Sequence, residues 1–332
     1  VEARLDRFVR DHLTPAVYRD ARPLAASAWN VPREPVPFDE AIAQPFEPVE
    51  LGWRWGRAWS TVWLRVTGEL PHEWVSSPQP NTRIEVLVDF GYNRSRSGFQ
   101  AEGLAYRPDG TLIKSIAPLN SYLPWSVDDG PIDVLIEAAA NPDVAGEYSF
   151  EPTGFGTWDS APDEPLYSLR QLEVAVLDVT VWELLQDIWT LRGLMAELPE
   201  GSSRRHLILR ALEDMLDVLN PDDISGSAQL GRDALAVVLA SPAHASAHSV
   251  VATGHAHIDS AWLWPLRETV RKCARTFTNV MDLMDTHPDF VFSCSSAQQF
   301  AWMKEFYPQV FSRIKEKVGR AVRAGRRHVG GK

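Results

Sequence analysis

The sequence predicts a multidomain fold in which an antiparallel β-sandwich and a helical segment precede the start of an α/β domain. Three observations support this prediction. Short alternating runs broken by turn signals fill residues 50–155, apolar residues recur at helical spacing through 165–240, and strand-like and helix-like runs alternate after residue 249. The 332 residues, 45% of them hydrophobic, suffice for two or three domains with sizeable cores.

The first 44 residues are predicted to form a helix followed by an extended arm. Leu5, Phe8, Val9 and Leu13 have helical spacing, which stops near Pro15. Residues 23–48 are rich in proline, which favours an extended connection over helix or central strand.

Residues 45–165 are predicted to form a jelly-roll-like β-sandwich. The runs 61–66, 83–89 and 133–137 alternate or are β-branched. Turn signals such as Pro-Asp-Gly at 108–110 and Asp-Gly-Pro at 129–131 separate such runs. Many short strands with this punctuation are typical of antiparallel sandwiches.

Residues 166–245 are interpreted as a helical linker segment. One predicted core stripe runs along the first helix, and a second covers 207–219 before Asn220-Pro221 ends it. A third helix is expected from about 227 to 239, and a small-residue linker follows at 241–248. Packing between helices is the default interpretation of such stripes. The members of the first stripe are Trp182, Leu185, Ile188, Trp189 and Met195.

Residues 249–332 are predicted to begin an α/β domain. Ser249–Thr253 and Phe290–Cys294 have the composition of short buried strands. Helices are expected at about 263–286, 296–304 and 307–324. Strands that alternate with helices along the chain are typical of α/β domains with a parallel sheet, so a barrel-like (β/α) arrangement is expected.

Composition excludes several classes of function. The net charge of −11 argues against a nucleic-acid partner and against an anionic membrane surface. The N-terminus VEARLDRFVR lacks the apolar core of a signal peptide, and no apolar run approaches ~20 residues, so a cytoplasmic location is expected. Cys273 and Cys294 are too few for a disulfide framework. Thirteen tryptophans fit either sugar stacking or core packing.

The segment 254–262, GHAHIDSAW, carries the clearest chemical signal. His255, His257 and Asp259 alternate along a locally extended chain, so their side chains can point the same way. Imidazole nitrogen with carboxylate oxygen suits Zn²⁺. Taken singly, a histidine is more often a hydrogen-bonded core residue and an aspartate after a strand a helix cap. Three such residues within five positions, between a strand and a helix, favour a metal site.

Residues 249–318 resemble the opening of the catalytic domain of the glycoside hydrolase family 38 α-mannosidases. The resemblance is carried by four stretches, of which the first is the longest, and it is most similar to the cytoplasmic or vacuolar-type branch. In that branch a β-sandwich and a helical segment precede the catalytic domain. The stretches are GHAHIDSAWLWPLRET (254–269), KCARTF (272–277), PDFVFSCSSAQQ (288–299) and WMKE (302–305).

The resemblance implies a single zinc ion held by His257 and Asp259, a nucleophilic aspartate and a more distant histidine. The zinc would coordinate two adjacent mannose hydroxyls during retaining hydrolysis of α-mannosidic linkages in oligosaccharides, and Trp262 would pack under the sugar. Another divalent metal remains possible. His255, Arg267 and Gln298 are candidates for an outer shell. Arg267 and Glu268, at the start of a predicted helix, could form a surface pair or support the site, and Gln298 and Gln299 could line the pocket.

The sequence departs from the family pattern near its end. Gly325–Gly331 is one residue shorter than the family's Gly-Arg-x-x-x-Val-Gly-Gly, and no acidic residue follows Glu316. The nucleophile is therefore expected beyond Lys332, and no catalytic residue is assigned within the chain. This polypeptide alone is expected to bind zinc weakly, to be inactive, and to expose apolar surface of an incomplete barrel.

Other functions stay open on the sequence. A non-catalytic carbohydrate-binding or relic fragment, whose sandwich would bind or present glycans or assemble with other subunits, is the main alternative. A homo-oligomer is also an open expectation. A metallo-β-lactamase-like hydrolase would need a histidine directly after Asp259, where this chain has Ser260.

Overall fold

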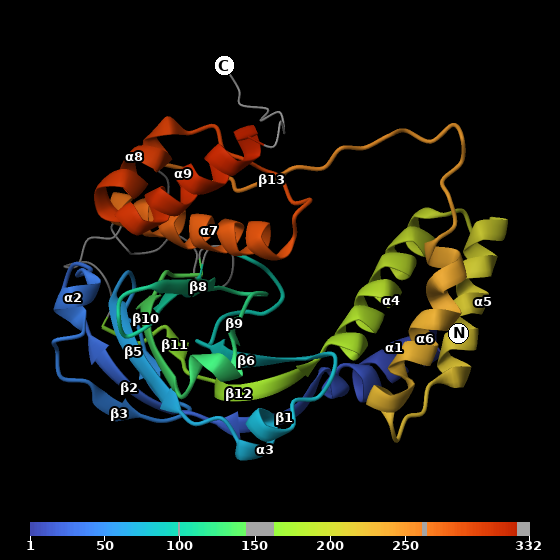
Figure 1. Ribbon diagram of the computed structural model, residues 1–332, viewed down its shortest axis with the longest axis horizontal. Helices are drawn as coiled ribbons and strands as arrows, with labels where there is room; N and C mark the ends of the chain where they lie inside the picture. The colour runs from blue at the N-terminus through green and yellow to red at the C-terminus, as the bar shows by residue number, and fades with distance from the viewer. Residues whose placement is uncertain (99, 144–162, 261–263, 324–332) are drawn as a thin grey trace.

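The computed structural model describes residues 1–98, 100–143, 163–260 and 264–323. Figure 1 shows three parts: a β-sandwich, a helical bundle beside it, and a layer of helices above one sheet. The predicted order of sandwich, helices and the start of an α/β domain is therefore confirmed. Among the described residues, no helix is both long enough and apolar enough to cross a membrane.

The sandwich consists of two antiparallel sheets with a shared core. The smaller has the order β1-β12-β6-β9 and the larger β3-β2-β5-β10-β7-β8, and β4 (Arg54–Trp55) pairs separately with β11 (Tyr167–Ser168). The strands of the smaller sheet are β1 (Tyr18–Pro23), β6 (Thr82–Asp89), β9 (Tyr122–Trp125) and β12 (Gln171–Asp178). Those of the larger sheet are β2 (Ala25–Asn30), β3 (Glu47–Val49), β5 (Thr61–Gly68), β7 (Glu102–Tyr106), β8 (Leu112–Ile116) and β10 (Ile132–Ala139).

The sandwich extends beyond the boundaries expected at residues 45 and 165. Strands β1 and β2 come from the predicted arm, and Pro23 and Pro48 lie on the edge strands β1 and β3, where a missing amide costs no ladder hydrogen bond. Strand β12 comes from the predicted helical segment. Its alternating side chains pair with β6 on one side and β1 on the other, so tertiary pairing decides its conformation.

The larger sheet is buried on both faces. On β5, Val62, Leu64 and Val66 point into the sandwich core, whereas Trp63 belongs to a second cluster that includes Phe277 of the overlying helix α7. This double burial explains why the strand has a nearly continuous apolar sequence, TVWLRVTG, rather than a simple alternation.

Helices α4 (Val179–Glu197), α5 (Ser203–Val218) and α6 (Ile224–Leu239) form the bundle, and α1 (Glu2–Phe8) packs against it through Leu5. A π-helical turn (Val9–Leu13) and a 3₁₀ turn (Pro15–Val17) lead from α1 into β1. The predicted core stripe of α4 is partly wrong. Ile188 and Met195 are buried, but Trp189 is 75% exposed, because the buried face is centred on Leu184 and Leu191.

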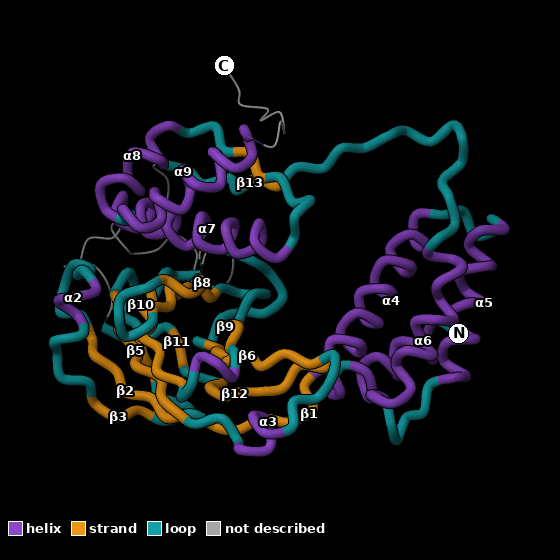
Figure 2. Tube along the Cα trace, in the orientation of Figure 1, coloured by secondary structure: helices purple, strands orange, loops and turns teal. Residues whose placement is uncertain are grey.

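The third part contains α7 (Leu266–Thr286), α8 (Ala297–Phe306) and α9 (Pro308–Arg323), close to the helices expected from the sequence. A long connection from α6 reaches it, as Figure 2 shows. The strand expected at 249–253 is wrong: these residues lack regular structure, and Val251 is 90% exposed because no described strand pairs with this segment. Short helical segments elsewhere are α2 (Phe38–Ala41), α3 (His72–Ser76) and a 3₁₀ turn (Val127–Asp129).

Candidate functional site

Two short parallel strands position the motif singled out in the sequence. Strand β13 (Gly254–His255) pairs with β14 (Phe292–Ser293), with Gly254 opposite Phe292. A Cβ atom at position 254 would lie 2.8 Å from the Phe290 ring, so a glycine is needed for this close approach. The pairing is parallel as expected, but the first strand is Gly254–His255 instead of the predicted 249–253, and the second covers only Phe292–Ser293 of the predicted 290–294.

The chain continues beyond β13 with alternating exposure. His255 and His257 are exposed, whereas Ala256 and Ile258 are partly covered and Ile258 packs on the core beneath. The alternation therefore turns the histidines outward, as expected for an extended segment. The side chains of His257 and Asp259 are 85% and 40% exposed, so both are open to a ligand from solvent.

His257 and Asp259 have a geometry suited to metal binding. Nε2 of His257 lies 3.3 Å from Oδ1 of Asp259. Two ligands of one tetrahedral zinc ion are about 3.3–3.5 Å apart, given Zn–N and Zn–O bonds near 2.0–2.2 Å. Among the residues that the structure describes, no group of three or more His, Cys, Asp or Glu side chains is placed to hold a metal ion together. The pair therefore fits zinc as part of a ligand set, and Trp262 lies outside the described residues.

Side chains of α7 and α8 contact the turn that contains Asp259 and hold it in place. The Thr269 hydroxyl accepts a hydrogen bond of 2.8 Å from Nε1 of Trp264 and lies 3.5 Å from the Asp259 carbonyl oxygen. The side chain of Gln299 donates to the Ile258 carbonyl at 3.3 Å. Thr269 and Gln299 are buried, so these contacts are shielded from water.

The Thr269→Val substitution is expected to destabilise the protein by about 1–3 kcal/mol, because valine preserves the shape but removes the hydroxyl that accepts the hydrogen bond from the buried indole of Trp264. Thr286→Val is the matched control on the same helix, since Thr286 is exposed and, among the described residues, its hydroxyl donates to carbonyl groups of its own helix. The measurement is the urea midpoint of each variant. Equal shifts in the two variants would contradict the role given to Thr269.

The remaining predicted site residues are not gathered around the pair. The His255 ring stacks on Phe292 at a centroid distance of 6.4 Å. Arg267 forms an ion pair with Glu34 at 3.2 Å, which ties α7 to the N-terminal arm. The side chain of Gln298 is exposed, and its neighbour Gln299 makes the contact with the motif.

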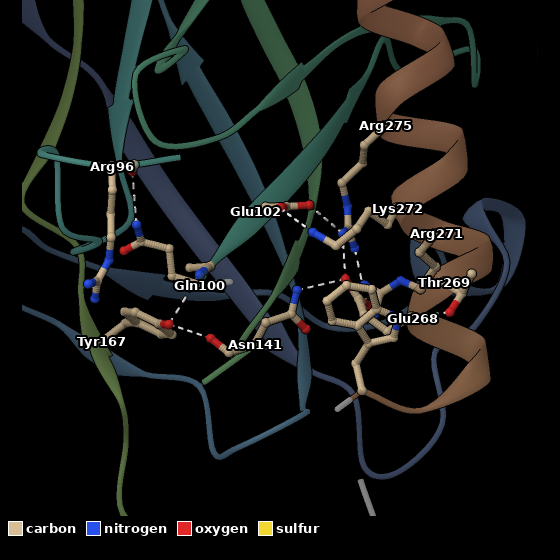
Figure 3. Close-up of polar contacts among 12 residues, drawn as sticks. Arg96, Gln100, Glu102, Asn141, Tyr167, Glu268, Thr269, Arg271, Lys272 and Arg275 are labelled. Carbon is tan, nitrogen blue, oxygen red and sulfur yellow. Dashed lines mark hydrogen bonds and ion pairs between the residues drawn. The ribbon is translucent and has the colours of Figure 1, made fainter. Parts of the chain in front are cut away.

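A buried ionic cluster joins α7 to the larger sheet directly after the motif (Figure 3). Glu268 binds Arg275 at 2.5 Å and Arg271 at 3.2 Å, and it accepts a 2.6 Å hydrogen bond from Asn141 at the end of β10. Three carboxylates thus face three cations, with every member of the cluster buried or nearly so. The other members are Glu102, Glu137 and Lys272, joined by Lys272–Glu102 at 2.5 Å, Arg275–Glu102 at 2.8 Å and Arg271–Glu137 at 3.0 Å.

The cluster determines the ionisation of its members. Burial alone would raise the pKa of Glu268, but the positive charges of Arg275 and Arg271 outweigh it and lower this pKa to about 2. The same balance, with Lys272 and Arg275 as the cations, lowers the pKa of Glu102. Burial would lower the pKa of Arg275, and the carboxylates of Glu268 and Glu102 raise it instead. Glu268, Glu102 and Arg275 are therefore held in their ionised forms at neutral pH.

The sequence interpretation missed this cluster, treating Arg267 and Glu268 as a surface pair or outer support. A signal was present: Glu268, Arg271 and Arg275 follow i, i+3, i+7 spacing on the face of α7 that also carries buried apolar residues. Glu137 likewise lies within a run that otherwise reads as a buried strand.

Comparison with known proteins covers both parts of the chain that flank the helical bundle. Residues 22–175 match the family described as "Alpha-mannosidase, jelly roll domain", and residues 247–327 match "Glycosyl hydrolases family 38 N-terminal domain". The chain is 32% identical to human alpha-mannosidase 2C1, over 89% of this chain and 27% of the relative. It is 30% identical to an alpha-mannosidase of Saccharomyces cerevisiae, over 83% of this chain and 24% of that protein. The chain thus spans about a quarter of the length of the curated relatives it matches.

Proposed function

Because the chain belongs to the glycoside hydrolase family 38 α-mannosidases, we propose that it forms the sandwich and the first metal-binding segment of a zinc-dependent retaining α-mannosidase. The substrate class is an oligosaccharide with α-mannosidic linkages. The observation that supports this proposal is the pairing of His257 Nε2 with Asp259 Oδ1 at 3.3 Å, at the carboxyl end of a parallel strand within the family-matched region.

His257 and Asp259 would hold the zinc ion, leaving coordination positions open to the sugar. When bound, zinc acts as a Lewis acid that orients and polarises sugar oxygens. Thr269 and Gln299 hold the carbonyl groups of this turn, so they keep the two ligand side chains on the same side of the chain. We propose that Trp262 packs under the sugar ring. The two carboxylates of a retaining glycosidase are not assigned to residues of this chain.

The test is hydrolysis of p-nitrophenyl α-D-mannoside by the full gene product that contains this chain. We expect turnover of the α-anomer and none of the β-anomer, loss of activity after EDTA dialysis, and recovery on adding zinc. Activity that survives complete removal of metal would contradict the zinc assignment. Sugar binding without hydrolysis of any α-mannoside would favour the non-catalytic alternative.

A further inference from the structure

A cavity of about 980 Å³ lies against the smaller sheet of the sandwich, apart from the segment that carries His257 and Asp259. Its walls come from α3, from β6 and β9, and from the C-terminal turns of α7. In Figure 1 α3 lies below this sheet and α7 above it. The volume is within the range of small-molecule sites, and none of its lining residues belongs to the motif 254–262.

Three aromatic rings line the cavity and are fixed by the protein itself. The indole N–H of Trp74 donates to Asp20 at 3.2 Å and that of Trp125 to the Gly130 carbonyl at 3.1 Å, so their polar edges are satisfied. The ring of Tyr122 also lines the wall. A cationic side chain that does not line the cavity lies over each ring. The distances from the charged group to the ring centroid are 5.8 Å for Arg22 over Trp74, 5.3 Å for Arg107 over Trp125 and 3.4 Å for Lys114 over Tyr122.

Two carboxylates in the wall retain unused hydrogen-bonding capacity. Glu85 is only 4% exposed, and one of its oxygens accepts a 2.8 Å hydrogen bond from the Tyr18 hydroxyl. Its second oxygen, and the carboxylate of Asp282 on α7, have no hydrogen-bond partner among the described residues. Burial raises the pKa of Glu85, so a donor from a ligand would stabilise its ionised form.

The charges of the lining select the class of ligand. Four carboxylates and two guanidinium groups line the cavity, and Arg22, Arg107 and Lys114 on its rings bring the charges close to balance, so a phosphate or other anion gains little net attraction. A cationic ligand would have to compete with the protein cations that already occupy the rings. A neutral ligand with many hydroxyl groups satisfies both conditions, because its hydroxyls donate to carboxylates and its C–H faces pack on aromatic rings. The charged lining residues are Asp20, Glu73, Glu85, Asp282, Arg19 and Arg83.

We propose that this cavity binds a short neutral oligosaccharide, with Glu85 and Asp282 accepting hydrogen bonds from its hydroxyls and Trp74 and Tyr122 contacting its rings. The site is separate from the proposed metal segment, so it would hold a glycan without cleaving it. The site itself goes beyond the proposed function, and only the choice of a mannosyl probe rests on that function.

The experiment is calorimetric titration of the 332-residue chain with α-linked mannotriose. We expect saturable binding, and at least about a tenfold loss of affinity in both Glu85→Gln and Asp282→Asn, since each removes a charged acceptor. Glutamine at position 85 retains an acceptor for Tyr18, so the sheet is preserved, and thermal midpoints verify this. Asp285→Asn is the matched control on α7: Asp285 pairs with Arg313 and Lys317 and does not line the cavity.

The outcomes separate the two proposals. Absence of binding, or full binding by both Glu85→Gln and Asp282→Asn, overturns the cavity site. Binding that is lost only in His257→Ala also overturns it, because the sugar then occupies the metal segment. Equal binding of maltotriose supports the neutral-sugar class while removing the preference for mannose. Hydrolysis plays no part in these measurements, so a failure of the α-mannosidase proposal leaves them interpretable.

Discussion

Glu268→Gln is expected to destabilise the protein by about 3–5 kcal/mol, as seen when one partner of a buried ion pair is removed. The wild-type cluster balances three carboxylates against three cations, and the glutamine leaves one net positive charge buried among Arg271, Lys272 and Arg275. Water cannot compensate this charge, because both Arg275 and Glu268 are at most 3% exposed. The measurement is the urea midpoint of the transition that releases α7 from the larger sheet.

Asp133→Asn provides the matched control for this prediction. Asp133 forms a two-point ion pair with Arg65 at 2.7 and 3.0 Å, but the two side chains are 31% and 49% exposed. An exposed pair of this kind contributes at most about 1 kcal/mol. A Glu268→Gln variant as stable as Asp133→Asn would show that the buried cluster is not required for docking α7.

The cluster also predicts how the loss of stability in Glu268→Gln depends on pH. The pKa of Glu268 is about 2 in the folded protein, below the ~4.3 of an unperturbed glutamate. A lowered carboxylate pKa contributes stability above the unfolded value, and this stability is lost as the pH falls through the folded value. The difference between wild type and Glu268→Gln should therefore be full above about pH 5 and shrink toward pH 2. A difference that is constant over this range would contradict the ionised state assigned to Glu268.

Local patterns explain which parts of the fold the sequence could predict. The runs 61–66, 83–89 and 133–137 are found in β5, β6 and β10, because the β-branched and apolar residues of each strand place one face in the sandwich core. Strand β12 also alternates, but it runs directly into α4, and its partner β6 lies about ninety residues earlier in the chain. Pairing over such a separation leaves no local sequence signal.

Local patterns could likewise predict one part of the candidate site, whereas its long-range contacts could not be predicted. His257 and Asp259 are two positions apart on an extended segment, so their proximity could be predicted from spacing alone. The contacts that hold their turn join Trp264, Thr269 and Gln299, and those that hold α7 join Glu268 to Asn141, 127 residues away. Periodicity on one element cannot indicate which distant strand supplies the opposite charge.

His257→Ala is expected to lower the zinc affinity of the chain by more than about 100-fold. Loss of an outer-shell partner typically costs 10–100-fold in metal affinity, and removal of a direct ligand should exceed that. The substitution leaves Asp259 as the only member of the pair, with no second His, Cys or carboxylate ligand gathered beside it among the described residues. The measurement is competition for zinc against a chromogenic chelator, which needs no catalytic turnover.

Two other histidines make this experiment decisive. His248 is exposed in the connection before β13, so His248→Ala removes the same side chain away from the motif and should leave zinc affinity unchanged. His255 stacks on Phe292, and as an outer-shell residue its replacement by alanine should cost no more than about 100-fold. Equal effects of His257→Ala and His248→Ala would remove the metal from this segment. A larger effect at His255 than at His257 would show that the first histidine of the motif, and not the second, binds zinc, since only direct coordination can outweigh the loss of the His257–Asp259 pair.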